Sequence, residues 1–268
     1  MRLLALLAFA AAAALAADNV LTADERKAGW VLLFDGRTMQ GWRDPAQENP
    51  PGDSWTIEDG CLKTRPKPRI TEDLVSAASY GDFELTFDWR LSPGGNSGVK
   101  YHIQKLIFLD NSKVKPGRFE SMVAGELSNP VSDRAGLAPA ATAQEYSIAF
   151  EMQLLDDERH PDAKNGPKYR TGALYGMVAP AATAANPPGE WNTGRILVKG
   201  GHVEHWINGV KVLDASLSDP GVGEGATKRW GQYPEVLKMF TDPKPSGPIS
   251  LQHHGDQVWF RNLKIRGL

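Results

Sequence analysis

Cysteine is almost absent from this sequence of 268 residues, in which Cys61 stands alone. One thiol cannot close a disulfide within the chain, so the fold does not depend on a disulfide framework. The neighbours of the thiol, Gly60 and Leu62, are small or apolar. A free cysteine in such surroundings usually behaves as a small apolar residue, and we expect Cys61 to be buried.

An excess of charge of one sign is also missing, because 30 Lys and Arg side chains stand against 32 Asp and Glu side chains. Nucleic-acid binding requires a basic surface that neutralises phosphates. Attachment to a membrane surface is typical of basic amphipathic stretches, and the sequence contains none. The charge balance therefore argues against nucleic acid and against a membrane as partners.

The short motifs of several enzyme classes are absent as well. The sequence contains no Gly-x-Ser-x-Gly elbow, no glycine-rich phosphate loop, no Cys-x-x-Cys pair and no His-Glu-x-x-His motif. These absences argue against serine hydrolases of the elbow type, nucleotide triphosphatases, thiol redox enzymes and zincin proteases.

Long apolar runs are missing except at the N-terminus. Arg2 precedes an apolar run at residues 3–15, and Ala14-Leu15-Ala16 fits the small-x-small pattern of a cleavage site. The run is shorter than the ~18–20 residues that a membrane-spanning helix needs. We therefore predict a signal peptide at residues 1–17, a single domain at residues 18–268, and a periplasmic or secreted protein.

Glycine and proline are plentiful by contrast, with 27 and 19 residues, as is typical of a turn-rich β-protein. Phe83, Leu85 and Phe87 alternate with polar residues, which indicates a strand with one buried face. Similar patterns predict further strands at residues 30–34, 55–62, 98–103, 146–155, 194–199, 202–207, 210–214, 249–253 and 258–265.

Turn and helix signals complete the expected fold class. Asn208-Gly209 between two alternating runs predicts a type I′ hairpin. Thr22 and Glu25 match a capping box that opens a short helix at residues 23–29, and a second short helix is expected at residues 233–240. With so few helices, the sequence predicts an all-β protein, an antiparallel two-sheet β-sandwich. The irregular stretches at residues 104–144 and 217–248 are interpreted as long loops that shape a cleft.

The strand at residues 146–155 carries the first candidate site residues, Glu151 and Gln153. Apolar residues occupy its even positions, so these two polar side chains share the opposite face. Asp156 and His160 follow in a group of six ionisable side chains at residues 156–162, which could bind a divalent ion or transfer protons. A solvent-facing strand and a charged loop held by salt bridges explain the same residues about as well.

Two other strands present further polar candidates. Lys100 and His102 share a face after the turn at residues 94–98, and Gln252 and His254 share parity where a strand enters a turn. Imidazoles are acid–base groups near neutral pH, although most single histidines satisfy local hydrogen bonds. Eight tryptophans are compatible with sugar binding, since indole rings stack on sugar CH faces, but core packing accounts for most of them.

Eight short motifs follow one another between residues 29 and 265. They are Gly29-Trp30-x-x-Leu33-Phe34-Asp35-Gly36, Trp55-x-Ile57-x-x-Gly60, Gly95-Asn96-Ser97-Gly98-Val99, Glu151-x-Gln153-x-Leu155-Asp156, Gly172-Ala173-x-Tyr175, Gly189-Glu190-Trp191-Asn192, His205-Trp206-x-Asn208-Gly209 and Leu251-Gln252-x-His254-Gly255. In this order they resemble the 3-keto-disaccharide hydrolase domain family. The resemblance implies a concanavalin A-like jelly roll that cleaves glycosides whose glucose carries a ketone at C3.

The chemistry of such a substrate suggests roles for the candidates. A ketone at C3 acidifies the C2 proton, so a base that removes this proton allows the C1–O bond to break by β-elimination, and water addition then completes a net hydrolysis. Glu151 or His254 is the candidate base, and Asp156 and His160 are the other catalytic candidates. Lys100, Arg170 or a divalent metal ion near Asp156 and His160 could stabilise the enolate.

The expected partner is therefore an oxidised saccharide. The full set of substrate-binding candidates is Asn96, Lys100, His102, Gln153, Arg170, Tyr175, Trp206 and Gln252. A non-catalytic carbohydrate-binding module is the competing prediction, because the same fold and the same tryptophans would serve it. The cluster of ionisable residues favours the enzyme, since a lectin more often binds hydroxyl groups with amides and aromatic rings.

Overall fold

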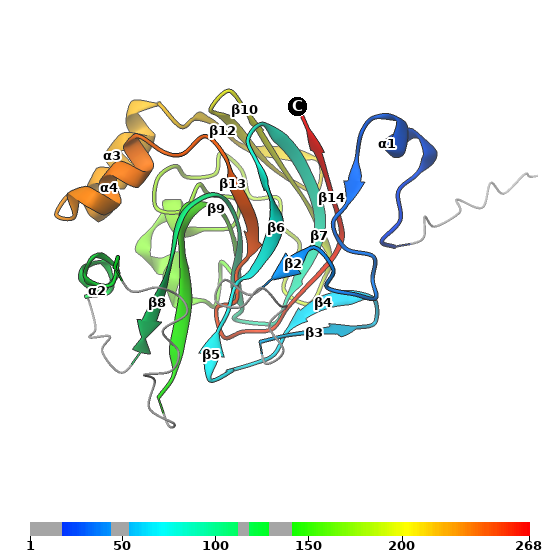
Figure 1. Ribbon diagram of the computed structural model, residues 1–268, viewed down its shortest axis with the longest axis horizontal. Helices are drawn as coiled ribbons and strands as arrows, with labels where there is room; N and C mark the ends of the chain where they lie inside the picture. Colours follow the sequence, from blue (N-terminus) through cyan, green and yellow to red (C-terminus); the bar gives the residue numbers. More distant parts are fainter. Residues whose placement is uncertain (1–17, 44–53, 112–117, 129–140) are drawn as a thin grey trace, which may run out of the picture.

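Two β-sheets packed face to face form the body of the protein (Figure 1). The computed structural model describes residues 18–43, 54–111, 118–128 and 141–268. The architecture is the predicted all-β sandwich of the concanavalin A-like jelly-roll type. Helices are short and lie outside the sheets, three of them on the side of the molecule opposite the N-terminal helix (Figure 1).

The larger sheet has eight strands in the order β12-β11-β10-β7-β14-β4-β3, with β1 paired to β14. Its strands are β1 (Val31–Leu32), β3 (Trp55–Glu58), β4 (Cys61–Thr64), β7 (Phe83–Leu91), β10 (Asn192–Lys199), β11 (His202–Ile207), β12 (Val210–Ser216) and β14 (Val258–Gly267).

The smaller sheet has six strands in the order β2-β6-β13-β8-β9-β5. Its strands are β2 (Trp42–Arg43), β5 (Ile70–Thr71), β6 (Leu74–Tyr80), β8 (Asn96–Asp110), β9 (Ala143–Leu155) and β13 (Gly247–Leu251). Among the strands of the described residues, pairing is antiparallel except between β5 and β9.

The core between the sheets follows from the alternation of apolar residues. Phe83, Leu85 and Phe87 of β7 are almost fully buried, and Phe150 and Met152 of β9 meet them from the smaller sheet. Each such side chain contributes roughly 1.5–3 kcal/mol when it leaves water. Side chains of a strand alternate between its two faces, so Glu151 and Gln153 must point away from this core.

In two hairpins, residues with positive φ form the turn and so determine where one strand ends and the next begins. Asn208 and Gly209 both have positive φ, 50° and 79°, which confirms the predicted hairpin between β11 and β12. The single strand expected at residues 55–62 is wrong: β3 and β4 form a hairpin around Asp59 and Gly60, whose φ angles are 51° and 72°. Cys61 begins β4 and is buried, as expected.

Helix α1 (Ala23–Lys27) opens with the predicted capping box, in which the Thr22 side chain accepts from the Glu25 amide. Helix α4 (Pro234–Thr241) confirms the second predicted helix. Helices α2 (Phe119–Gly125) and α3 (Pro220–Trp230) were not predicted.

The stretch expected as one long loop at residues 104–144 is shorter than predicted. Strand β8 continues to Asp110, β9 begins at Ala143, and α2 lies between them. The stretch at residues 217–248 contains α3 and α4 instead of a loop.

The predicted signal peptide lies outside the described residues. Within the described part of the chain, no helix is both long and apolar enough to cross a membrane.

Candidate active site

A cavity of about 540 Å³ lies over the smaller sheet, on the face that points away from the core. Its walls come from α2, α3 and two 3-10 turns, η3 (Pro161–Asn165) and η4 (Pro167–Tyr169). The volume falls within the roughly 300–1,000 Å³ of small-molecule sites. The predicted site residues that line it are Asn96, Glu151, Gln153, His160, Tyr175, Gln252 and His254.

The Glu151 carboxylate lies at the centre of this face, directly over Gly98 of the neighbouring strand. A Cβ atom built on Gly98 would lie 2.1 Å from Glu151 Oε1. Glycine therefore provides the space that the carboxylate occupies, which gives a physical reason for the Gly98 of the motif.

Behind Glu151 is a buried ion pair that does not reach the cavity. Lys100 Nζ donates to Asp73 Oδ2 at 2.9 Å, and both side chains are 1% exposed. With its amide oxygen toward Lys100, Gln252 accepts from Nζ and donates to Glu151 Oε1, both at 3.3 Å. Gln252 thus connects the buried lysine to the carboxylate that faces the cavity.

These surroundings make the Glu151 carboxyl a weaker acid than an exposed glutamic acid. Burial raises the pKa of the Glu151 carboxyl to about 7, because the attraction of Lys100 offsets only part of the loss of hydration. Burial lowers the pKa of Lys100, but Asp73 and Glu151 outweigh this effect and raise it, so the ammonium stays charged. Near neutral pH Glu151 can therefore both accept and release a proton.

Two buried amide oxygens in the cavity have no hydrogen-bond partner among the residues that the structure describes. They are Asn96 Oδ1 and Gln153 Oε1, on side chains of residues that are 3% and 1% exposed. Buried polar atoms without a partner are uncommon in native proteins and suggest a site where a ligand supplies the missing donor. Hydroxyl groups of a sugar are suitable donors.

At one end of the cavity, His160 and His254 lie close together, with ring centroids 5.8 Å apart. Each of the two and Asp256 offers a ligand atom, and these atoms lie within 4.8 Å of one another. Enclosure by the cavity walls and the nearby His160 lower the pKa of His254, although part of its ring remains open to solvent. His254 is therefore neutral at pH 7.

Arg229 brings a positive charge into the cavity. Its Nε donates to Glu120 Oε1 at 3.1 Å, and its guanidinium lies 5.1 Å from the centre of the Tyr175 ring. The hydroxyl of Tyr175 donates to Asp162 Oδ2 at 2.8 Å. Burial raises the pKa of Tyr175, so the phenol keeps its proton at neutral pH.

Two predicted substrate contacts on β8 are wrong. Lys100 is sealed behind Glu151 and bonded to Asp73, so it cannot touch a ligand. His102 has a positive φ of 47° at an irregularity in the pairing of β8 with β9, which takes it out of the strand alternation. Its Nε2 is hydrogen-bonded to the Gly81 carbonyl, away from the cavity.

The prediction of Asp156 as a catalytic residue is also wrong for this cavity, which it does not line. Its Oδ2 accepts from the Gly94 amide, and its Oδ1 accepts from the amides of Glu158 and Arg159. Burial raises the pKa of Asp156, but these backbone bonds outweigh burial and lower it. The carboxylate holds the loop after β9 in place and lines a separate cavity of about 290 Å³.

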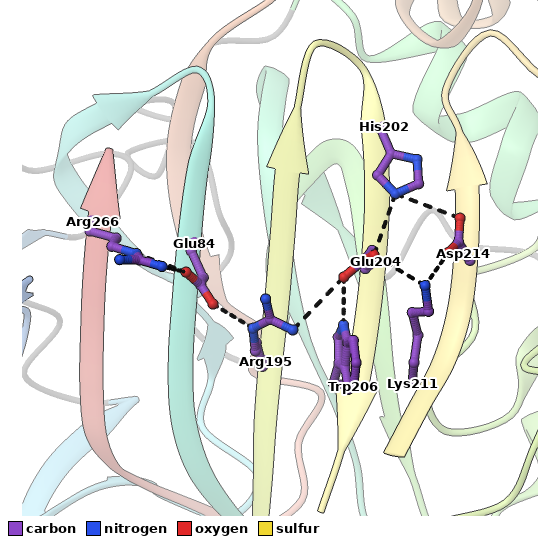
Figure 2. A network of polar contacts seen from close by, with 8 residues as sticks. All are labelled: Glu84, Arg195, His202, Glu204, Trp206, Lys211, Asp214 and Arg266. Carbon is purple, nitrogen blue, oxygen red and sulfur yellow. Dashed lines mark hydrogen bonds and ion pairs between the residues drawn. The ribbon is translucent and has the colours of Figure 1, made fainter. Parts of the chain in front are cut away.

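Arg170 and Trp206 lie outside the cavity too. Arg170 ends η4 and is exposed to solvent. Trp206 lies on the outer face of the larger sheet, where its Nε1 donates to Glu204 Oε2 and Arg195 stacks on its ring (Figure 2). His205, one residue earlier, points into the core, so strand alternation turns Trp206 outward.

Several cavity residues were not predicted as site residues. They are Phe119, Glu120, Gln144, Tyr146, Pro161, Asp162, Asn165, Tyr169 and Arg229. The most informative of them, Arg229, lies in the last turn of α3. A helix start was visible in the pair Asp219-Pro220, since proline is favoured in the first turn, and it could have placed Arg229 on a helix.

Comparison with known proteins agrees with the geometry. A model of the 3-keto-alpha-glucoside-1,2-lyase-like domain matches residues 29–266. The chain belongs to this family. Among family relatives, a 3-keto-disaccharide hydrolase of Bacteroides thetaiotaomicron is 32% identical over 262 residues, which cover 90% of this chain and 79% of the relative. The resemblance inferred from the motifs is confirmed.

Solved structures share the fold. A candidate glycosyl hydrolase of Parabacteroides distasonis superimposes with a TM-score of 0.69 and 27% identity, covering 94% of this chain and 100% of that one. A second candidate glycosyl hydrolase of the same species gives a TM-score of 0.57 and 25% identity, covering 89% of this chain and 99% of that one.

Proposed function

We propose that this protein is an enzyme that cleaves the glycosidic bond of 3-keto-glycosides or 3-keto-disaccharides. The family and the name of the Bacteroides thetaiotaomicron relative support the substrate class. The observation that carries the proposal is the Glu151 carboxyl, buried in a cavity with a pKa raised to about 7. A base with this pKa suits the removal of a proton made acidic by a neighbouring ketone.

In the proposed reaction, Glu151 takes the proton from C2, and the electrons of the C2–H bond form an enolate with the oxygen at C3. The enolate electrons then form the C1–C2 double bond while the C1–O bond breaks. The leaving oxygen takes up a proton. Water adds to C1 and a proton returns to C2, so that elimination and hydration together amount to hydrolysis.

We assign the role of base to Glu151 and not to His254 because more contacts fix the position of the Glu151 carboxylate. Gln252 and Gly98 hold its carboxylate in one position, whereas His254 lies at the rim and is partly open to solvent. A base must be positioned within hydrogen-bond reach of the proton that it removes. His254 remains available for proton transfer at the leaving group or to water.

The other cavity residues fit supporting roles. Arg229 supplies a positive charge suited to the developing enolate, and the Tyr175 oxygen, whose proton is donated to Asp162, can accept from a hydroxyl group of the substrate. Asn96 and Gln153 each have an amide oxygen that no described residue bonds to and that can accept from a sugar hydroxyl.

We also propose where a divalent ion would bind if the reaction uses one. Of the sequence candidates near Asp156 and His160, only His160 has suitable neighbours in the described residues, namely His254 and Asp256. Two imidazoles and a carboxylate are ordinary ligands of transition metals. An ion there would polarise an oxygen of the substrate. Metal analysis of the purified protein, and its unfolding temperature with and without a chelator, test this site.

Export is a further proposal, supported by the leader-like residues 1–17. Mass determination of the protein recovered from a bacterial periplasm tests it. Cleavage after residue 16 or 17 is expected.

The function is tested by incubating the purified protein with a 3-keto-disaccharide and with its unoxidised parent. Release of a free sugar from the oxidised substrate alone is the expected result. Binding of the oxidised sugar without cleavage would support the competing carbohydrate-binding module instead. Equal cleavage of both sugars would contradict the ketone-dependent reaction and indicate ordinary glycosidase chemistry.

A further inference from the structure

We infer that a groove beside the cavity binds the leaving sugar of the substrate, which makes it the site that distinguishes disaccharides from smaller glycosides. This inference rests on the proposed function. The groove has a volume of about 500 Å³ and lies over α3 and the first turn of α2. It therefore adds a second compartment comparable in size to the cavity that holds Glu151.

The groove and the cavity share a boundary. Glu120, Tyr169 and Arg229 line both compartments. The Nε of Arg229 donates to Glu120 at 3.1 Å, so the two side chains form a bar between the compartments. A molecule that extends beyond this bar from Glu151 enters the groove.

The backbone holds this boundary in place through a close approach. A Cβ atom on Gly225 of α3 would lie 2.5 Å from the Cα of Met177, so only glycine allows the helix to contact this turn. Gly225 and Arg229 are four residues apart and share a face of the helix. The contact at Gly225 therefore fixes the position of the Arg229 side chain at the boundary.

The lining of the groove suits a neutral, hydroxyl-rich ligand. Tyr169 and Tyr233 offer aromatic rings for sugar CH faces, and Thr227 and Gln232 offer both donors and acceptors. Glu120 pairs with Arg229 at the boundary, and Lys228 adds an ammonium that can donate hydrogen bonds to sugar hydroxyls.

Glu151 lines the cavity but not the groove, and this difference determines which sugar ring lies in each. Proton removal at C2 requires the oxidised ring to lie beside Glu151 in the cavity. The bond that breaks leads from C1 of this ring to the leaving group. The sugar in the groove is therefore the one that is released, and an enzyme with this groove should favour disaccharides over methyl glycosides.

The test compares two substrates, a 3-keto-disaccharide and methyl 3-keto-glucoside, in the wild type and two tryptophan variants. Gln232→Trp fills the groove at an exposed position, and Glu235→Trp adds the same side chain at an exposed position of α4 outside both compartments. Unfolding temperatures of the variants verify that both are folded. The quantity measured is the ratio of kcat/KM for the disaccharide to kcat/KM for the methyl glycoside.

Gln232→Trp is expected to lower this ratio about tenfold, mainly through KM for the disaccharide, while Glu235→Trp leaves it unchanged. An unchanged ratio in Gln232→Trp, or an equal fall in both variants, would overturn the inference and leave the proposed function intact. A wild type that cleaves neither substrate would instead overturn the proposed function, and this inference with it.

Discussion

On the outer face of the larger sheet, Glu84 lies between Arg195 and Arg266 (Figure 2). In the cavity, the hydrogen-bond partner of the Glu151 carboxylate among the described residues is the Gln252 amide, and the nearby ammonium of Lys100 is bonded to Asp73. The same outer face pairs Glu204 with Lys211 at 3.2 Å. Hydrogen bonds from Trp206 and Lys211 outweigh the burial of Glu204 and lower its pKa, while burial raises the pKa of Glu151 to about 7.

This contrast separates a structural cluster of charges from a functional one. The outer face has more charged side chains, and its group His202, Glu204 and Asp214 could even hold a metal ion by position. Lys211 already bonds to two of these carboxylates, so their charge is compensated. In the cavity, the charge of Glu151 is compensated only in part, and two amide oxygens lack hydrogen-bond partners in the described part of the chain. A deficit of partners, not a density of charge, marks the site.

The largest expected effect is on catalysis. Glu151→Gln keeps the shape of the side chain and removes the base, so kcat should fall by about 10²–10⁴-fold with little change in binding. Glu204→Gln makes the same chemical change on the outer face and should keep wild-type kinetics. Steady-state assays on a 3-keto-disaccharide measure both, and equal activity of the two variants would refute the contrast.

The next effect is on stability. Lys100→Met leaves the buried Asp73 carboxylate without its cation and should cost about 3–5 kcal/mol of unfolding free energy. Lys63→Met breaks a pair with the half-exposed Glu58 and should cost about 0–1 kcal/mol. Urea denaturation compares the two. Similar small losses would show that the ion pair behind Glu151 is not truly buried.

A third prediction concerns pH. Because the pKa of Glu151 is raised from 4.5 to about 7 on folding, the wild type should lose stability relative to Glu151→Gln as the pH rises through this interval, by up to about 3 kcal/mol. Glu204, with a lowered pKa, should show the opposite sign: the wild type loses stability relative to Glu204→Gln as the pH falls below 4.5. Denaturation curves between pH 3 and pH 8 measure both differences. The same sign for both would contradict the assignment.

The smallest effect comes from a single methyl group. Gly98→Ala places a Cβ atom against Glu151 and should displace the carboxylate, lowering kcat by about tenfold while the fold remains. Gly267→Ala adds the same methyl group where no atom lies within 4 Å and should have no effect. Assays of the two alanine variants compare them, and an unchanged kcat in Gly98→Ala would show that the exact position of Glu151 is unimportant.

The sequence predicted the part of the site that depends on strand alternation. Glu151 and Gln153 interrupt an apolar period of two, and the structure places both in the cavity. The same reasoning failed for His102, because an irregularity in strand pairing changes the face of every residue that follows it. The motif that contains Trp206 does not indicate on which face of the sheet the indole lies.

Other parts of the site depend on contacts that a sequence pattern does not contain. Arg229 reaches the cavity because Gly225 lets α3 approach Met177, and this contact joins residues far apart in the chain. The hairpin at Asp59-Gly60 is different, since an Asp-Gly pair is itself a type I′ signal and could have been recognised. The buried pairing of Lys100 with Asp73 required the tertiary structure.

The central claim, that Glu151 removes the C2 proton of a 3-keto sugar, is tested most directly by the fate of that hydrogen. A 3-keto-disaccharide carrying deuterium at C2 of the oxidised ring is incubated with the wild type and with Glu151→Gln, and cleavage and deuterium loss are followed together. The account predicts that the wild type cleaves the deuterated substrate more slowly or loses the label to solvent, and that Glu151→Gln loses both activities. Cleavage at an undiminished rate with deuterium fully retained at C2 would contradict it.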